Sequence, residues 1–210
     1  MSEFDSAAFV RFVGTFADRV HEGRDELTRL DSAIGDADHG INMDRGFTAV
    51  RGKLAEVNGS DLGVAAKTVG MTLISTVGGA SGPLYGTLFL RMATAFGDRT
   101  SVGADELGNA LRAALDGVRQ RGKAELGDKT MVDAMSPAVD AYEAAISDGI
   151  GAALDAAATA AAQGRDRVTP LVARKGRASY LGERAAGHAD PGATSTTILF
   201  ESLRDAVAES

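Results

Sequence analysis

Apolar residues in this chain recur at the spacing of α-helices and almost nowhere at the spacing of β-strands. Between residues 5 and 30 the large apolar side chains stand three or four positions apart: Phe9, Phe12, Val13, Phe16 and Val20. This stripe predicts an amphipathic helix. Stretches rich in Ala and Leu predict further helices at about 42–56, 61–77, 83–97, 104–121, 130–147, 149–163 and 194–208. Because alternating runs of strand length are scarce, we predict an all-α fold of about eight helices.

The length of 210 residues suits one domain, so we expect residues 1–210 to form a single unit. The segment from Thr68 to Leu90 carries no charge over a length that could span a membrane. Its middle reads Gly78-Gly79-Ala80-Ser81-Gly82-Pro83, which would leave backbone groups unpaired in lipid. We therefore expect a buried element that is interrupted by a functional loop.

Charge and the absence of cysteine narrow the possible functions. The formal net charge of -7 gives no long-range attraction to nucleic acid or anionic lipid. Because the chain has no Cys, metal binding would fall to Asp, Glu and His. The first five residues, Met-Ser-Glu-Phe-Asp, carry acid where a secretory signal carries base. We expect a cytoplasmic protein with no nucleic-acid and no membrane partner.

The densest functional signal is the run Asp31-Ser32-Ala33-Ile34-Gly35-Asp36-Ala37-Asp38-His39-Gly40. Two unit charges about 4 Å apart repel by roughly 4 kcal/mol at an effective dielectric near 20, so three carboxylates sharing one turn need a positive partner. The run contains no Lys or Arg, and hard divalent cations favour carboxylate oxygens. We predict that magnesium binds to Asp31, Asp36 and Asp38. An exposed acidic loop without a ligand is the alternative.

The residues around the aspartates favour a ligand site. Gly35 and Gly40 would let the backbone approach a ligand, and the helix start that follows would point free N–H groups at an anion. An EF-hand loop would also begin with Asp36 and Asp38, but its position twelve, which requires Glu, is Phe47. His39 could donate a hydrogen bond to phosphate, although a structural hydrogen bond explains it equally well.

Two further segments could bind phosphate. The run Gly78 to Pro83 offers several backbone N–H groups, although close helix packing by small residues explains it as well. The segment from Gly164 to Gly192 shows no helical period and has the composition of a lid, a binding loop or a disordered segment. Its basic residues could hold polyphosphate or form a solvated loop: Arg174, Lys175, Arg177 and Arg184. His188 lies within this segment and adjoins a proposed ligand site, and Thr194 or Ser195 could cap the last helix.

Together and in this order, the motifs closely resemble DhaL, the nucleotide-binding subunit of bacterial dihydroxyacetone kinases. The resemblance runs essentially end to end, except for about residues 140–168. Its most specific pieces are Ile34 to Gly40, Gly78 to Pro83, Arg121 to Glu125 with Gly127 to Met131, and Gly176 to Arg184.

The resemblance implies an eight-helix barrel with the nucleotide at one end and two magnesium ions between its phosphates and the protein. Asp31, Asp36 and Asp38 match the metal ligands of the family. The positions that match nucleotide contacts are His39, Gly40, Ile41, Asn42, Ala80, Ser81, Gly122, Met131, Arg177, Asp190, Pro191 and Gly192. Arg177 is the candidate catalytic residue, because phosphoryl transfer needs positioning and charge neutralisation more than a protein nucleophile.

The resemblance also implies partners. In the family a separate subunit binds the hydroxyketone through its own histidine, and this subunit presents the γ-phosphate. We favour a phosphoenolpyruvate-glycerone phosphotransferase in which bound ADP is recharged by a phosphohistidine carrier. The alternatives are a subunit of a dihydroxyacetone or tetrulose kinase with exchangeable ATP, and a nucleotide-loaded regulatory module. A homodimer is a further expectation.

Overall fold

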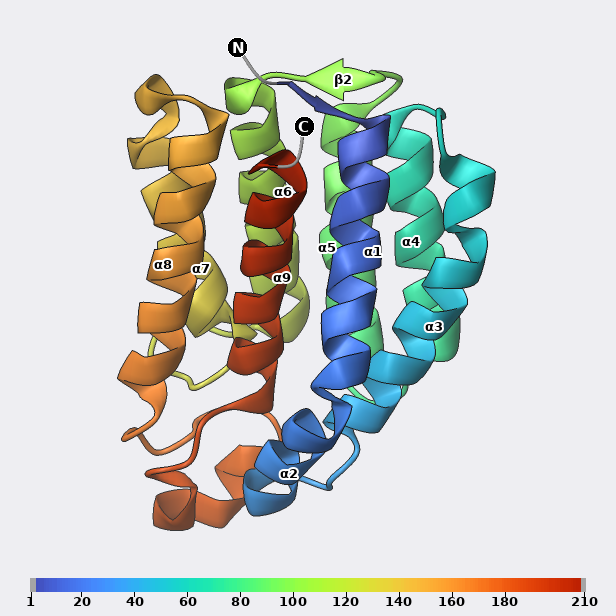
Figure 1. The fold of residues 1–210 in the computed structure, drawn as a ribbon. Helices are drawn as coiled ribbons and strands as arrows, with labels where there is room; N and C mark the ends of the chain where they lie inside the picture. Colours follow the sequence, from blue (N-terminus) through green and yellow to red (C-terminus); the bar gives the residue numbers. More distant parts are fainter. Residues whose placement is uncertain (1–2, 209–210) are drawn as a thin grey trace.

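The computed structural model describes residues 3–208, and in this range the chain is helical apart from two short strands and the loops (Figure 1). The prediction of an all-α fold is confirmed. The elements in order are β1 (Phe4–Asp5), α1 (Ser6–Glu22), α2 (Arg24–Ile34), α3 (His39–Val57), α4 (Leu62–Thr76), α5 (Ser81–Phe96), β2 (Ser101–Val102), α6 (Ala104–Gly122), α7 (Met131–Ala144), η1 (Ile146–Asp148), α8 (Ile150–Val168), η2 (Arg177–Ala185) and α9 (Pro191–Ala208).

The first predicted helix is divided in two at Gly23. The backbone N–H of Gly23 closes the last turn of α1 on the carbonyl of Arg19, and α2 starts directly afterwards. The helical structure then continues to Ile34, beyond the predicted end at residue 30. Asp31 therefore lies on the last turn of a helix, which corrects the expectation that the three aspartates share one turn.

Buried apolar side chains from most of the helices form one core. Its aromatic centre joins α1, α3 and α5: the rings of Phe16 and Phe47 meet edge to face with centroids 4.6 Å apart, and Phe89 packs against Phe12. Each of these rings is almost fully buried, and burial of a Phe side chain contributes about 1.5–3 kcal/mol. The stripe that was predicted from the spacing of residues 9–20 is the side of α1 that faces this core.

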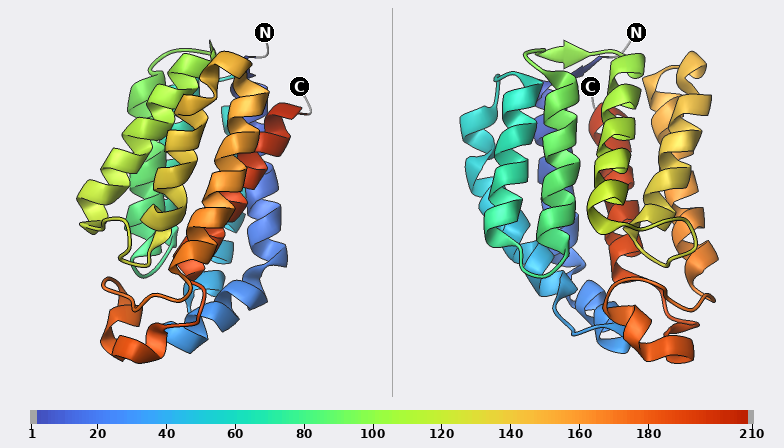
Figure 2. Two further views of the ribbon diagram at one scale, coloured as in Figure 1. Left: turned by 90° about the vertical axis from the view of Figure 1, so that its left-hand side faces the viewer. Right: turned by 180° about the vertical axis from the view of Figure 1, so that it is seen from behind.

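The long helices run up and down, so that α3, α5, α7 and α9 all begin at the same end of the bundle (Figures 1 and 2). Packing contacts lead from α1 to α3 and on through α4, α5, α6, α7 and α8 to α9, which packs against α1. The short antiparallel pair of β1 and β2 lies at the opposite end. Because a helix N-terminus carries a partial positive charge, the arrangement gathers positive dipole ends at one end of the molecule.

The uncharged segment from Thr68 to Leu90 forms parts of α4 and α5 with a loop between them. A Cβ at Gly70 would lie 2.9 Å from the carbonyl oxygen of Gly86, so glycine lets the two helices approach closely. No helix within residues 3–208 is both long and apolar enough to cross a membrane.

Candidate functional site

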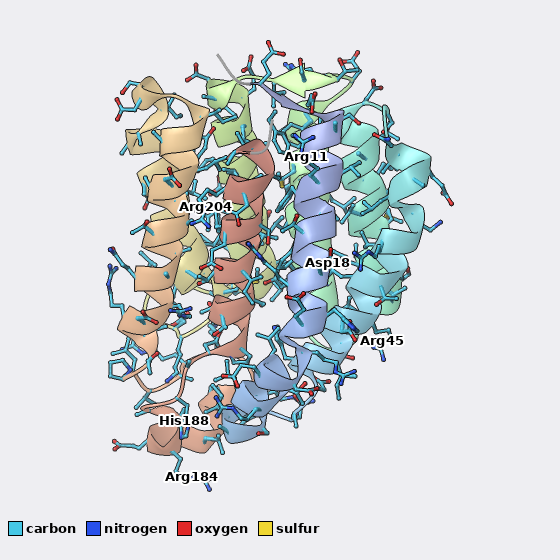
Figure 3. All side chains as sticks on the ribbon, viewed as in Figure 1. Arg11, Asp18, Arg45, Arg184, His188 and Arg204 are labelled. Atoms are coloured by element: carbon cyan, nitrogen blue, oxygen red, sulfur yellow. The ribbon has the colours of Figure 1, made fainter. Side chains whose placement is uncertain are left out.

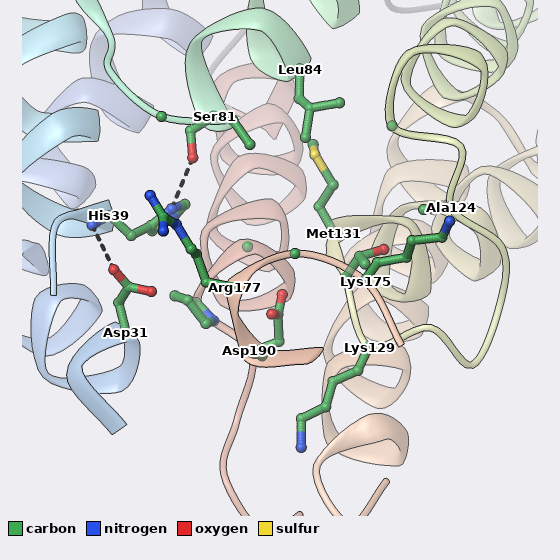
Figure 4. A pocket seen from close by; sticks show the side chains of 18 of the residues that line it. Asp31, His39, Ser81, Leu84, Ala124, Lys129, Met131, Lys175, Arg177 and Asp190 are labelled. Atoms are coloured by element: carbon green, nitrogen blue, oxygen red, sulfur yellow. Dashed lines mark hydrogen bonds between the residues drawn. The ribbon is translucent and has the colours of Figure 1, made fainter. Parts of the chain in front are cut away.

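A pocket of about 690 Å³ opens at the end where α3, α5, α7 and α9 begin (Figure 4). Its volume is in the range of sites for small ligands and cofactors. The wall is built from the starts of these four helices, the end of α6, the turn after α2 and the basic segment around η2. Residues from both halves of the chain therefore meet in one cavity.

Asp31, Asp36 and Asp38 come together at one side of the pocket, with one carboxylate oxygen of each within 4.8 Å of the others. Asp31 is buried, and its Oδ2 accepts hydrogen bonds from the backbone N–H groups of Asp38 at 2.8 Å and His39 at 3.1 Å. The carboxylate of Asp31 thus bonds to backbone N–H groups at the start of α3 that have no partner within the helix. Asp38, the N-cap residue of α3, makes no side-chain capping bond. The side chain of Asp38 is left facing the pocket.

The electrostatics of this cluster favour a bound cation. Burial and the neighbouring carboxylates of Asp36 and Asp31 raise the pKa of Asp38 above its usual value. The guanidinium of Arg177 contacts Asp36 at 3.1 Å, but both side chains are largely exposed, so solvent screens the pair. A set of three carboxylate oxygens fits a hard divalent cation such as magnesium.

Gly35 and Gly40 allow close approach within the protein. A Cβ at Gly35 would overlap the Oδ1 atom of Asp31, and a Cβ at Gly40 would overlap the carbonyl oxygen of Arg24. The expectation that these glycines face a ligand is therefore replaced by a structural reason. They let the start of α3 and its preceding turn fold back onto α2 and hold the carboxylate of Asp31 in place.

His39 joins the starts of three helices. Its Nδ1 atom hydrogen-bonds Ser81 Oγ at 3.0 Å, and its Nε2 atom hydrogen-bonds Ser195 Oγ at 3.0 Å. Ser195 Oγ also contacts the hydroxyl of the buried Tyr85 at 2.7 Å. Burial lowers the pKa of His39 to about 4, so the imidazole is neutral at pH 7. Both ring nitrogens are engaged by hydroxyl groups, which favours the structural explanation of this residue.

The glycine run borders the pocket next to Asp38. Gly79 has a φ of +65°, and a Cβ at this position would lie 3.9 Å from the carboxylate of Asp38. Gly82 is needed for another reason, because its Cβ would overlap the carbonyl oxygen of Val77. Ala80 and Ser81 follow Gly79 at the start of α5, where the first backbone N–H groups of a helix are free to bind an anion.

The far side of the pocket is apolar. Leu84 of α5, Val118 of α6, Ala124 and Met131 form this wall next to Gly122. The turn before α7 is fixed by Asp133, whose carboxylate accepts the N–H groups of Gly127 at 2.5 Å and Thr130 at 2.8 Å.

Four residues that line the pocket were not predicted from the sequence as site residues: Leu84, Val118, Thr130 and Val132. Val118 lies one helical turn before Gly122, a spacing that could have revealed it.

The basic segment folds over the pocket mouth. Lys175 and Arg177 line the cavity together with Gly176 and Ala178. A small apolar cluster of Ile34, Ala173, Ala178 and Ala185 packs the segment onto α2. Arg184 and His188 are exposed at the lower end of the molecule, outside the pocket lining (Figure 3).

Asp190 begins α9. Its Oδ2 atom accepts the N–H of Ala193 at 2.7 Å, and Pro191 occupies the first helical position, where a missing N–H costs nothing. The expectation that Thr194 or Ser195 caps this helix is wrong, because both hydroxyls bond to carbonyls of the preceding turn. Burial raises the pKa of Asp190 to about 7.

Most of the residues singled out from the sequence lie in the pocket wall: Asp31, Asp36, Asp38, His39, Ala80, Ser81, Gly122, Met131, Arg177, Asp190, Pro191 and Gly192. Gly40, Ile41 and Asn42 lie outside the lining. Gly40 packs on α2, and the side chain of Ile41 is 51% exposed. The amide oxygen of Asn42 accepts a 2.7 Å hydrogen bond from Arg45.

Comparison with known proteins gives consistent matches. The family model described as the DAK2 domain matches residues 33–205. The ADP-binding subunit DhaL of the PEP-dependent dihydroxyacetone kinase of Escherichia coli K12 is 49% identical over 185 residues, which cover 87% of this chain and 88% of that protein. The ADP-binding subunit DhaL of PEP-dependent dihydroxyacetone kinase 1 of Listeria innocua is 44% identical, covering 95% of this chain and 96% of that protein.

The fold also matches a solved structure. The native dihydroxyacetone kinase of C. freundii superposes with a TM-score of 0.74 at 26% sequence identity. The match covers 94% of this chain and 34% of that kinase, so this chain corresponds to about a third of the larger protein.

Proposed function

This chain belongs to the DAK2 domain family, together with the ADP-binding DhaL subunits, and from this we propose that it is the nucleotide-binding subunit of a dihydroxyacetone kinase. It would hold ADP or ATP in the pocket and transfer phosphate to dihydroxyacetone on a separate subunit. The observation that carries the proposal is the meeting of three carboxylates within 4.8 Å at the end where four helices of residues 3–208 begin.

Asp31, Asp36 and Asp38 would hold two magnesium ions. Magnesium supplies positive charge that offsets the crowded carboxylates and the phosphate oxygens together. Of the three aspartates, Asp31 is held by the backbone of α3, so its position is fixed before any ligand arrives. Asp36 and Asp38 lie on the turn between α2 and α3 and can adjust to the ion.

The helix starts would bind the phosphate groups. The backbone N–H groups of Ala80, Ser81 and Gly192 lie at positive dipole ends that favour anions. The apolar wall of Leu84, Val118 and Met131 would receive the base of the nucleotide. One end of the pocket thus suits phosphate groups and the other end suits an apolar base, as a nucleotide requires.

Arg177 would act on the phosphate that is transferred. It lines the pocket next to Asp36 and brings a guanidinium to the side where the carboxylates gather. Stabilising charge on the phosphoryl group is the main task in such a reaction, and a protein nucleophile is not required. Arg177 is therefore our candidate for the catalytic residue.

Two of the relatives are named as subunits of PEP-dependent kinases, and we infer the phosphate donor from this. We propose that ADP stays bound and is recharged in place by a phosphohistidine carrier. A kinase that exchanges ATP in every cycle cannot hold ADP tightly without slowing its turnover, whereas a relay of this kind loses nothing by tight binding. The succession of helix contacts from α1 to α9 supports the eight-helix barrel and one phosphotransfer domain; a homodimer stays a prediction.

Reconstitution tests the function. The purified chain is combined with a dihydroxyacetone-binding subunit, and product is measured with excess ATP or with trace ADP and a phosphoenolpyruvate-charged carrier. We expect product in the second case, and bound ADP that survives dialysis in magnesium but not in EDTA, since the metal links the nucleotide to the folded chain. Release of labelled ADP faster than turnover would favour exchangeable ATP. If no product forms with ATP and none forms with the charged carrier, the proposed function is contradicted.

A further inference from the structure

Lys129 is a fully buried lysine of the pocket wall, and its ammonium hydrogen-bonds to backbone carbonyls rather than to the carboxylates described above. Its side chain is 1% exposed. The ammonium Nζ donates hydrogen bonds to three backbone carbonyls, those of Thr169 at 2.8 Å, Leu171 at 2.9 Å and Ala185 at 2.6 Å. A lysine ammonium has three protons, so its donor capacity is completely used.

The backbone around Lys129 is held in the conformation that directs this side chain. Lys129 has a φ of +64°, which is uncommon for a residue with a Cβ. The flanking N–H groups of Gly127 and Thr130 are both bound by the carboxylate of Asp133. Figure 4 shows the side chain of Lys129 directed towards the bottom of the view, while Asp31 and His39 lie higher and to the left.

The three acceptors lie at the two ends of the basic segment over the pocket mouth, which we call the lid segment and define as residues 169–187. Thr169 and Leu171 stand at its beginning and Ala185 near its end. The N–H of Gly187 also donates to the carbonyl of Thr169 at 2.9 Å, which closes the same base. Lys175 and Arg177 lie between these ends and line the pocket.

We propose that Lys129 is a positioning residue that closes the base of the lid segment and thereby places Arg177 over the pocket. The inference rests on the proposed function, because Arg177 is given its role there. A single ammonium that bonds to both ends of the loop limits the positions open to the residues between them. The cations of the lid segment are thus held beside the aspartates before a ligand binds, which lowers the ordering cost of binding.

A role in stability alone is the competing explanation, and the chemistry of the contact separates the two. A neutral side chain in this place would leave the carbonyls of Leu171 and Ala185 without this donor, while the carbonyl of Thr169 would keep the N–H of Gly187. The loss would fall on the lid segment, because the helices make their own backbone hydrogen bonds. Local loosening of residues 169–187 without loss of helix is therefore the expected signature of Lys129→Met.

The first experiment compares Lys129→Met with Lys123→Met. Lys123 is a matched control because it lies in the same inter-helix segment, also has a positive φ of 49°, and is exposed. We expect amide exchange in residues 169–187 to become at least about tenfold faster in Lys129→Met and to stay unchanged in Lys123→Met, with circular dichroism unchanged in both. Unchanged exchange in Lys129→Met would overturn the proposal.

The second experiment measures coupling to Arg177. Magnesium-ADP affinity is determined by calorimetry for Lys129→Met, Arg177→Ala and the double variant. We expect Lys129→Met to weaken binding about tenfold in the wild-type background and by less than about twofold when Arg177 is already Ala, because the lysine acts through the arginine. Full additivity would mean that Lys129 acts independently of Arg177 and would overturn the positioning role.

A third variant covers the case in which Lys129→Met does not fold. Lys129→Arg keeps the charge and several donors, so we expect part of the exchange protection and of the affinity to remain. Protection as low as that of an unfolded loop, despite native helix content, would overturn the proposal. Failure of the wild-type chain to bind magnesium-ADP would instead contradict the proposed function, and the exchange experiment would still test the lid contact.

Discussion

Arg177 Nη2 lies 3.1 Å from Asp36 Oδ2, so a cation of the lid segment contacts one of the three carboxylates that were predicted to hold magnesium. The two side chains are 68% and 41% exposed, and pairs of this kind contribute about 0–1 kcal/mol to stability. Such a weak contact is easily exchanged for stronger ones. A metal ion could take the carboxylate while the guanidinium turns to a phosphate, which makes both residues better tests of function than of stability.

Asp36→Asn should weaken magnesium-ADP binding by at least about tenfold, because it removes one charged metal ligand. The chain should keep its helix content, because Asp36 lies on a partly exposed turn. Calorimetry with magnesium-ADP measures the effect. Asp25→Asn is the matched control, since Asp25 is an exposed aspartate of α2 that also pairs with an arginine. Equal affinities for Asp36→Asn and wild type would show that the aspartates do not form the metal site.

Arg177→Ala should lower turnover with the partner subunit by about 10²-fold, the size of effect seen when one charge-stabilising donor is removed from a transition state. The free energy of unfolding should change by less than about 1 kcal/mol, because the ion pair with Asp36 is exposed. Arg184→Ala is the control, as Arg184 lies on the same η2 but outside the pocket lining. Turnover that is the same in both variants would reduce Arg177 to an ordinary surface residue.

Gly35→Ala should disturb the metal site without adding any polar group. The new Cβ would overlap Asp31 Oδ1, and the carboxylate would have to leave the N–H groups of Asp38 and His39. We expect magnesium-ADP affinity to fall at least about tenfold. Gly52→Ala, on α3, meets no atom within 4 Å and should bind normally while gaining up to about 1 kcal/mol of stability. Normal binding by Gly35→Ala would mean that Asp31 is free to move.

Much of the fold could be predicted from local patterns. The helices follow from the spacing of apolar residues and from runs rich in Ala and Leu. The aspartate motif and the glycine run directly precede such stretches, so the sequence also places them at helix starts. The aspartate cluster could also be predicted from the sequence, since its residues are at most seven positions apart. The break at Gly23 was missed, because a glycine inside a helical pattern is often tolerated.

The rest of the site depends on contacts between distant parts of the chain. His39 meets Ser195 across 156 positions, and Lys129 meets Ala185 across 56. Nothing in the local sequence of Lys129 shows that three carbonyls will surround its ammonium, because those acceptors are backbone atoms that any residue could supply. Such contacts require the packed helices to be known first.

Asp190→Asn should reveal a buried carboxyl group through the pH dependence of stability. Burial raises the pKa of Asp190 from 3.8 to about 7, so the folded chain holds a proton there that the unfolded chain has lost. The resulting contribution to stability is fully present below pH 3.8 and is lost as the pH rises to about 7. Over this range the loss is on the order of 4 kcal/mol.

His39 acts in the opposite direction. Its pKa falls from 6.5 to about 4, so its contribution to stability is present above pH 6.5 and is lost as the pH falls towards 4. The two groups offset each other between about pH 4 and 6.5, and the wild-type curve alone would hide both. A difference between two variants separates them, because the His39 contribution is common to both chains.

The measurement is urea unfolding of wild type and Asp190→Asn at pH 4 to 8, in EDTA and without nucleotide. Asn keeps the cap on α9, since its side-chain oxygen can accept the N–H of Ala193 as Asp190 does. We expect the unfolding free energy of Asp190→Asn, relative to wild type, to rise from pH 4 to about 7 and then to stay constant. Asp148→Asn, an exposed change outside the pocket lining, controls for the substitution itself. A constant difference at every pH would mean that the pKa of Asp190 is not raised in the folded chain, and would contradict the prediction.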